Sequence, residues 1–168
     1  MRRMLLLAAL AFGIAVLLPG RALPAAGGSS VPFKGSQSGY GTVDLTTLPV
    51  AQAHFTTSGV SSHLGLTSLT QEAVVVFTGP TSFTFTGTWT ETAANGDQIF
   101  GVVSGSGVFT DPTHNTIVAS YTSSGGTGRF ADASATFTAT VHGTRISLEA
   151  GIATNYYEGT AEGQLSYH

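Results

Sequence analysis

The stretch that decides the fold is SFTFTGTWTETAANGDQIFGVVSGSGVF, residues 82–109. In its first half, Phe83, Phe85 and Trp89 alternate with threonines. In an extended chain this alternation places aromatic side chains on one face and hydroxyl groups on the other. β-Branched and aromatic residues in period two are typical of a half-buried strand. The pattern therefore predicts a β-strand with an aromatic inner face.

A hairpin is predicted directly after this strand. Asn95 and Gly96 form the dipeptide most favoured in tight hairpin turns, because both residue types tolerate positive φ. Residues 98–109 then alternate again as the returning strand. Further strands are predicted from the same pattern at 33–40, 51–59, 61–66, 69–77, 116–123, 129–142, 145–150 and 155–167.

Eight to ten short strands separated by turns are typical of an all-β barrel or sandwich. Residues 72–77, EAVVVF, are apolar on both faces, so this strand is expected to lie centrally. We favour a single closed antiparallel β-barrel of about eight strands, because closure removes exposed strand edges.

The first 25 residues are predicted to be a helical signal peptide, with the barrel domain at residues 26–168. Arg2 and Arg3 precede an apolar run from Leu5 to Leu18, and small residues follow it. This is the three-part arrangement of a secretory leader, with cleavage expected near Ala25 or Ala26. The run is shorter than a membrane span of roughly 20 residues. We therefore expect a secreted or periplasmic protein with no membrane span after cleavage.

Charge and cysteine content exclude several classes of function. The whole chain carries 6 basic and 9 acidic residues, a net charge of −3. Three of the bases lie in the leader, so the domain keeps three bases against nine acids, a net charge of −6. Such a surface does not attract phosphate backbones, and we expect no nucleic-acid partner. The chain has no cysteine, which excludes disulfides and thiolate metal sites.

Four segments resemble one known superfamily. They are Pro32–Gly39 (PFKGSQSG), Ser61–Ser68 (SSHLGLTS), Thr92–Gly101 (TAANGDQIFG) and Gly125–Phe137 (GGTGRFADASATF). Together they resemble the exported bacterial proteins of the allene-oxide-cyclase-like and dirigent-like β-barrel superfamily. The resemblance covers nearly all of the mature chain and implies the same closed barrel.

The last of these segments departs from the superfamily pattern at two positions. Asp132 and Ala135 stand where the superfamily usually has glycine. Plant members include a cyclase and proteins that steer radical coupling, but their catalytic carboxylates and polar pocket residues match no identifiable positions here. The resemblance therefore implies a fold and assigns no catalytic residue.

The glycine-rich segment before residue 129 has two interpretations. Gly125, Gly126 and Gly128 could form a phosphate-binding loop, but such a loop needs a helix after it. The residues that follow alternate as a strand. We interpret the glycines as a structural turn in which they adopt backbone angles closed to other residues.

His63 and Glu91 are the catalytic candidates. His63 lies within one of the superfamily segments, and Glu91 shares a strand face with Phe83 and Phe85. A carboxyl group buried in an apolar lumen has a raised pKa and can serve as a general acid. The non-catalytic alternatives are that His63 is a hydrogen-bonded structural histidine and that Glu91 is exposed at the barrel rim. The histidines are not spaced as in a local metal-binding motif, and no cofactor is expected.

Three functions remain open from the sequence. The first is a binding or scaffold role, with a small apolar ligand held against Phe83, Phe85 and Trp89. The second is an isomerase or cyclase acting on an apolar substrate, which rests on family analogy alone. The third is an envelope or matrix structural protein, favoured by an apolar patch on the outer face. Homo-oligomerisation is compatible with the resemblance, and no sequence feature fixes it.

Overall fold

The computed structural model describes residues 29–167, which form eight β-strands and one short 3₁₀ helix. The elements, in chain order, are β1 (Ser30–Asp44), β2 (Val50–Ser61), β3 (Gly65–Phe77), β4 (Ser82–Ala93), β5 (Gln98–Phe109), β6 (His114–Gly126), η1 (Gly128–Phe130), β7 (Ser134–Glu149) and β8 (Ile152–Ser166). The signal peptide predicted for residues 1–25 lies outside the described residues.

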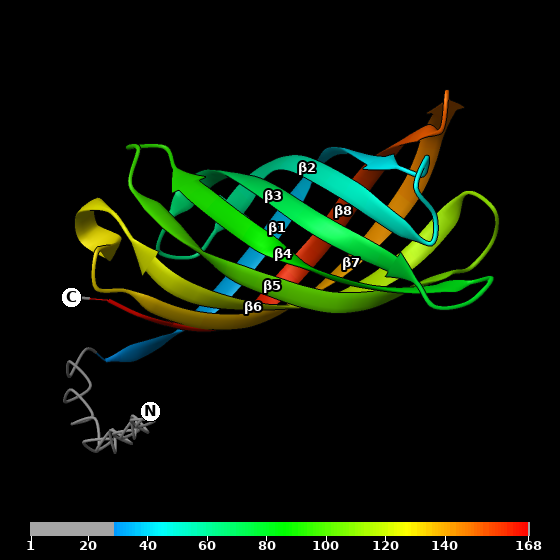
Figure 1. The fold of residues 1–168 in the computed structure, drawn as a ribbon. Coiled ribbons are helices and arrows are strands. Elements are labelled where there is room, and N and C mark those ends of the chain that lie inside the picture. Colours follow the sequence, from blue (N-terminus) through cyan, green and yellow to red (C-terminus); the bar gives the residue numbers. More distant parts are fainter. Residues whose placement is uncertain (1–28, 168) are drawn as a thin grey trace, which may run out of the picture.

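The strands form one closed antiparallel barrel in which each strand pairs with its neighbours in the chain (Figure 1). The first and last strands close the barrel, with Ser30 opposite Ser166 and Asp44 opposite Ile152. Closure gives every strand two hydrogen-bonding partners and leaves no sheet edge. The prediction of a single closed all-β barrel of about eight strands is confirmed.

The period-two pattern determines which side chains face inward. In β4, Phe83, Phe85 and Trp89 are all buried inside the barrel, while Thr84 and Thr86 are exposed on the outer wall. The prediction of an aromatic inner face is therefore confirmed. β3 was expected to lie centrally because its apolar residues occupy both faces. In the structure only one face is buried, and Val74 and Val76 are each 38% exposed on the outer wall.

Glycines of β5 make room for the rings of β4. Gly107 lies opposite Phe83, and Gly105 lies opposite Phe85. A Cβ atom at Gly107 would lie 2.2 Å from the Phe83 ring, and one at Gly105 would lie 2.6 Å from the Phe85 ring. The two glycines are therefore required by these close ring contacts, and bending of the strand does not explain them.

The two ends of the barrel differ in how they are filled. One end, which we call the closed end, carries the turns at 62–64, 94–97 and 127–133. Leu64, Ile99, Phe130 and Leu165 are all buried there. The other end, which we call the mouth, carries the loops at 45–49, 78–81, 110–113 and 150–151. Figure 1 shows η1 and the end of β8 together at the closed end.

Two predicted strands are corrected at the closed end. Residues 61–66 are not a separate strand, because 62–64 form the turn between β2 and β3. The strand predicted to begin at residue 129 begins at Ser134 instead. The intervening residues form η1 and a turn that bring the Phe130 side chain into the core, where it is 0% exposed. Alternation alone cannot reveal a single helical turn of this length.

Candidate functional site

A cavity of about 260 Å³ lies inside the barrel. Its lining includes Leu48, Pro112 and Thr113, all exposed in loops of the mouth, so the cavity reaches the surface there. At its other extreme it is lined by Glu91, close to the closed end. Leu64, Ile99, Phe130 and Leu165, which fill the closed end, do not line it. The cavity is therefore a blind pocket entered from the mouth.

Aromatic rings make up much of the cavity wall. Phe83 and Phe85, both predicted as ligand contacts, line it. Phe83 belongs to a cluster near the mouth, with its ring centroid 6.0 Å from Phe77 and 5.4 Å from Phe109. The other aromatic lining residues are Phe33, Phe55, Tyr121, Phe137 and Tyr157. A wall of this kind suits a compact apolar ligand.

Trp89 lies behind this wall. Its ring packs edge-on against Tyr121 and Phe137, at centroid distances of 5.6 Å and 5.3 Å. Its Nε1–H donates a hydrogen bond to the Val102 carbonyl at 3.1 Å. Trp89 does not line the cavity, in contrast to the expectation that it would contact a ligand. It supports two residues that do line it.

Glu91 faces inward, as its strand phase predicts, and is 1% exposed. Its Oε1 accepts hydrogen bonds from the Ser61 hydroxyl at 2.5 Å and from the Gln37 amide at 2.8 Å. Burial raises the pKa of this carboxyl above the ordinary glutamate value, and hydrogen bonds from Ser61, Thr67 and Gln37 partly oppose that rise. The alternative prediction, that Glu91 is exposed at the barrel rim, is therefore wrong.

The polar groups at the inner end of the cavity form two separate hydrogen-bonded sets, one around Glu91 and one between Tyr121 and Gln71. Gln37 accepts a hydrogen bond from the Thr57 hydroxyl at 2.6 Å while it donates to Glu91. Tyr121 donates to the Gln71 side chain at 2.9 Å, and burial raises the pKa of its hydroxyl. Most hydrogen-bonding groups here are satisfied within the protein, which fixes the side chains in place.

A second polar group lies at the mouth and was not predicted. Asn115 of β6, Arg145 of β7, and Asn155 and Tyr157 of β8 all line the cavity. We call these four residues the mouth arc. Asn115 is 7% exposed, and its Oδ1 has no hydrogen-bond partner among the described residues. Burial raises the pKa of the Tyr157 hydroxyl.

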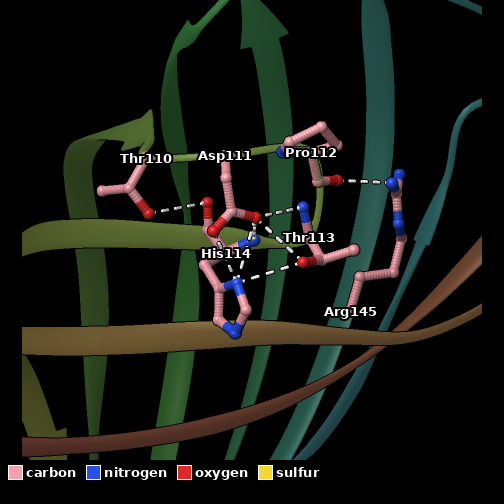
Figure 2. A network of polar contacts seen from close by, with 6 residues as sticks. All are labelled: Thr110, Asp111, Pro112, Thr113, His114 and Arg145. Atoms are coloured by element: carbon pink, nitrogen blue, oxygen red, sulfur yellow. Dashed lines mark hydrogen bonds and ion pairs between the residues drawn. The ribbon is translucent and has the colours of Figure 1, made fainter.

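The loop beside the mouth arc is held by Asp111 (Figure 2). Its carboxylate accepts hydrogen bonds from the backbone N–H groups of Thr113 at 2.7 Å and His114 at 2.9 Å. These bonds, together with those from the two side chains, hold the pKa of Asp111 well below its usual range. Figure 2 also shows the Arg145 guanidinium donating to the Pro112 carbonyl from the other side of the loop.

His63 lies at the closed end and does not line the cavity. Its Nε2 contacts the Pro32 carbonyl at 3.1 Å, and its Nδ1 contacts the Tyr167 hydroxyl at 3.2 Å. Its own carbonyl accepts a hydrogen bond from Arg129 at 2.8 Å. The structure thus separates the two catalytic candidates, and the contacts of His63 are those of a structural histidine.

Of the five predicted turn residues, Asn95, Gly96 and Gly128 lie in turns, whereas the prediction is wrong for Gly125 and Gly126. At the β4–β5 hairpin, Gly96 has a φ of +88°, while Asn95 has ordinary φ and accepts a hydrogen bond from Asp97 N–H at 3.2 Å. In the glycine-rich segment only Gly128 has positive φ, at +55°. Gly125 and Gly126 are instead the last residues of β6. Gly126 is required for space, since a Cβ there would lie 2.3 Å from the Phe130 carbonyl oxygen.

Within residues 29–167, no group of three or more His, Cys, Asp and Glu side chains is arranged to hold a metal ion. No helix in the same range has the length and apolar character needed to cross a membrane.

Comparisons with known proteins give one structural neighbour. No protein-family model matches the chain, and no curated protein sequence matches it. The chain is similar to the solved structure of the pterocarpan synthase dirigent protein GePTS1, with a TM-score of 0.37 and 11% sequence identity. The match covers 87% of this chain and 95% of that one.

Proposed function

We propose that this protein is an exported binding protein that holds one small, largely apolar ligand inside its barrel. The observation that carries the proposal is the blind, aromatic-lined cavity with its opening at the mouth. An eight-stranded barrel is wide enough either to be filled by side chains or to hold one small ligand. Here the lumen keeps about 260 Å³ free, which favours the second possibility.

The composition of the cavity wall supports an apolar ligand. Phe33, Phe83 and Phe137 come from three different strands and present ring surfaces to the same space. Burial of apolar ligand surface against such rings stabilises a complex by roughly 25 cal/mol for each Å² removed from water. Few polar groups interrupt this part of the wall, so the body of the ligand needs no hydrogen bonds there.

Naphthalene is a suitable neutral probe of the cavity. We expect binding to change the fluorescence of Trp89, the chain's single tryptophan, because its ring packs against two lining residues. Isothermal titration calorimetry measures the affinity. The proposal is contradicted if the full mature protein binds neither naphthalene nor larger apolar compounds by either method.

A matched pair of variants places the binding inside the barrel. Ala139 is buried, lines the cavity and has no hydrogen-bonding side chain, so Ala139→Leu fills space that the probe needs. Thr140, the next residue, is exposed on the outer wall. We expect Ala139→Leu to weaken naphthalene binding strongly and Thr140→Leu to leave it unchanged. Equal effects of the two substitutions would locate the probe outside the cavity.

The environment of Glu91 favours a second candidate function, proton transfer to or from a ligand in an isomerase-type reaction. Glu91 lines the cavity, and its raised pKa keeps the proton to a higher pH than for an exposed glutamate. A carboxyl group of this kind can donate a proton to an enol or accept one from a carbon next to a carbonyl. Glu91→Gln keeps the shape and removes the exchangeable acid. If the protein is an enzyme of this type, that substitution abolishes turnover while ligand binding persists.

A structural role in an envelope or matrix receives less support. It requires a gathered apolar patch on the outer wall. The exposed large apolar side chains of the strands are instead distributed over β1, β2, β3, β5, β6 and β7. Some meet in pairs across the β2–β3 ladder, as Val60 meets Leu66, and others face polar residues, as Val118 faces Ser106 across the β5–β6 ladder.

A further inference from the structure

We propose that the cavity selects a ring-shaped carboxylic acid that also carries a hydroxyl group, with Arg145 recognising the carboxylate and Asn115 the hydroxyl. This inference rests on the proposed ligand-binding function and adds the chemical class of the ligand. It follows from hydrogen-bonding groups of the mouth arc that the protein itself leaves without partners.

Asn115 carries the first part of the argument. Its side chain is 7% exposed, and its Oδ1 is buried without a partner among the described residues. No hydrogen bond within residues 29–167 uses its side-chain N–H₂ either. A buried carboxamide without partners is costly, so such groups nearly always meet a complementary group. A ligand hydroxyl can donate to the amide oxygen and accept from the amide nitrogen.

Arg145 carries the second part. It is half-buried in the cavity wall, and its guanidinium donates to the Pro112 carbonyl. No acidic side chain of the described residues forms an ion pair with Arg145, although Arg129 pairs with Asp97 and Lys34 with Glu162. The nearby Asp111 carboxylate accepts hydrogen bonds from Thr113 and His114 of its own loop. The remaining guanidinium N–H groups can therefore bind a carboxylate in the two-bond geometry that arginine favours.

The strand register brings these two residues to one place. Asn115 lies opposite Gly143, which lies opposite Tyr157, and the three form one row across β6, β7 and β8. Arg145 lies opposite Asn155, one inward position closer to the mouth. Rows of inward residues are separated by roughly 7 Å and neighbouring strands by about 4.8 Å. One ring with two substituents can therefore reach both side chains.

Gly143 makes the arrangement possible. A Cβ at this position would lie 2.6 Å from the Asn115 Oδ1 and 2.8 Å from the Tyr157 ring. The missing side chain lets the Asn115 amide lie across β7, between the cavity and the strand backbone. Gly143 is thus a positioning residue for Asn115, and any side chain there would displace the amide.

The polar groups at the inner end do not compete for the same ligand groups. Glu91, Gln37 and Gln71 already have partners within the protein. Aromatic rings line the space between these groups and the mouth arc. The ring of the ligand is therefore expected to lie against the phenylalanines, with its carboxylate and hydroxyl directed back toward the entrance.

Four related compounds test the proposal on the full mature protein. They are naphthalene, naphthoate, the naphthoate with a hydroxyl group meta to its carboxylate, and the methyl ester of that hydroxy acid. We expect the hydroxy acid to bind about tenfold to hundredfold more tightly than its ester, since a charge-assisted hydrogen bond is lost on esterification. We expect it to bind roughly threefold to tenfold more tightly than plain naphthoate, which lacks the hydroxyl.

Variants assign each preference to its residue. Arg145→Met should make the acid and its ester bind equally, whereas Lys34→Met removes the same charge from the outer wall and should change nothing. Asn115→Leu should remove the preference for the hydroxyl, and Gln52→Leu is its control on the outer wall. Naphthalene binding to each variant shows that the cavity is still formed.

The outcomes separate this inference from the proposed function. If naphthalene binds but the wild-type protein does not prefer the acid over the ester, the ligand class is wrong and the binding function stands. If the acid is preferred and Arg145→Met keeps that preference, Arg145 is not its receptor and the proposal is overturned. If no compound binds, both the ligand class and the binding function fail.

Discussion

The closed end and the mouth of this barrel use the same kinds of side chain in opposite ways. At the closed end Glu91, Gln37 and Ser61 satisfy one another, and Phe130 completes a packed core. At the mouth Asn115 keeps an unpaired oxygen. A buried polar group with partners holds a fold together, and one without partners has a cost that a ligand can remove.

From this difference we infer that the closed end stabilises the fold and that the mouth recognises the ligand. Arg129 at the closed end joins three turns, since it donates to the His63 carbonyl, pairs with Asp97 and lies over the Phe130 ring. Arg145 at the mouth has one carbonyl partner and, among residues 29–167, no acidic partner. If this assignment is right, substitutions at the two ends have different effects on the free energy of unfolding.

The largest expected effect comes from a phenylalanine deletion at each end. Phe130→Ala removes a ring that is 0% exposed and should lower the free energy of unfolding by about 3–5 kcal/mol. Phe109→Ala removes a partly buried ring at the mouth and should cost about 1 kcal/mol. Urea denaturation measures both values. Similar losses at the two sites would show that the mouth is as tightly packed as the closed end.

One polar substitution at each end should change the free energy of unfolding in opposite directions. Ser61→Ala removes a donor to Glu91 and should destabilise the protein by roughly 1–3 kcal/mol. Asn115→Leu removes the unpaired amide and should raise the free energy of unfolding, by about 1 kcal/mol. Thermal unfolding followed by circular dichroism checks both variants. A destabilised Asn115→Leu protein would mean that the amide contributes to the fold.

The pH dependence of stability should report on Glu91. Because its folded-state pKa is raised by burial, the folded state holds this proton more tightly than the unfolded state does. Its stabilising contribution is complete below the ordinary glutamate value of 4.5 and is lost as the pH rises through the folded pKa. The loss is at most about 1.4 kcal/mol per pH unit. Glu91→Gln should remove this decline, and a wild-type profile that matches the variant would contradict the assignment.

Asp111 at the mouth should show the reverse dependence and the smallest effect. Hydrogen bonds, of which the one from the Thr113 N–H has the largest effect, lower the pKa of Asp111. The contribution of its carboxylate to folding stability is therefore complete above the ordinary aspartate value of 3.8. It is lost as the pH falls through the lowered pKa. Asp111→Asn should speed amide hydrogen exchange at Thr113 and His114 above that value, with little change in global stability. Unchanged exchange at both amides would show that the carboxylate does not hold the loop.

Much of the fold and part of the site could be predicted from local sequence. Period two in β4 placed Phe83, Phe85 and Glu91 on the inner face, and the structure has them there. The strand phase was sufficient because each inward position follows from its neighbours two residues away. The turn at Asn95 and Gly96 was equally local, and its position was right although Asn95 has ordinary φ.

The mouth arc could not be recognised in the same way. Asn115, Arg145 and Tyr157 belong to three strands, and only the ladder register brings them together. A signal was nevertheless present, since the inward phase that begins at Phe137 reaches Arg145 through alternate residues. Trp89 shows the opposite limit, because its inward phase was right but the rings of Tyr121 on β6 and Phe137 on β7 lie between it and the cavity.

The ladder between β1 and β8 has a consequence for how the chain is made. β8 is the last of the described strands to be synthesised, and its partner β1 is the first. Contacts so far apart in sequence form slowly, because a long loop must close before they contribute any stability. The barrel therefore cannot close before β8 has been synthesised.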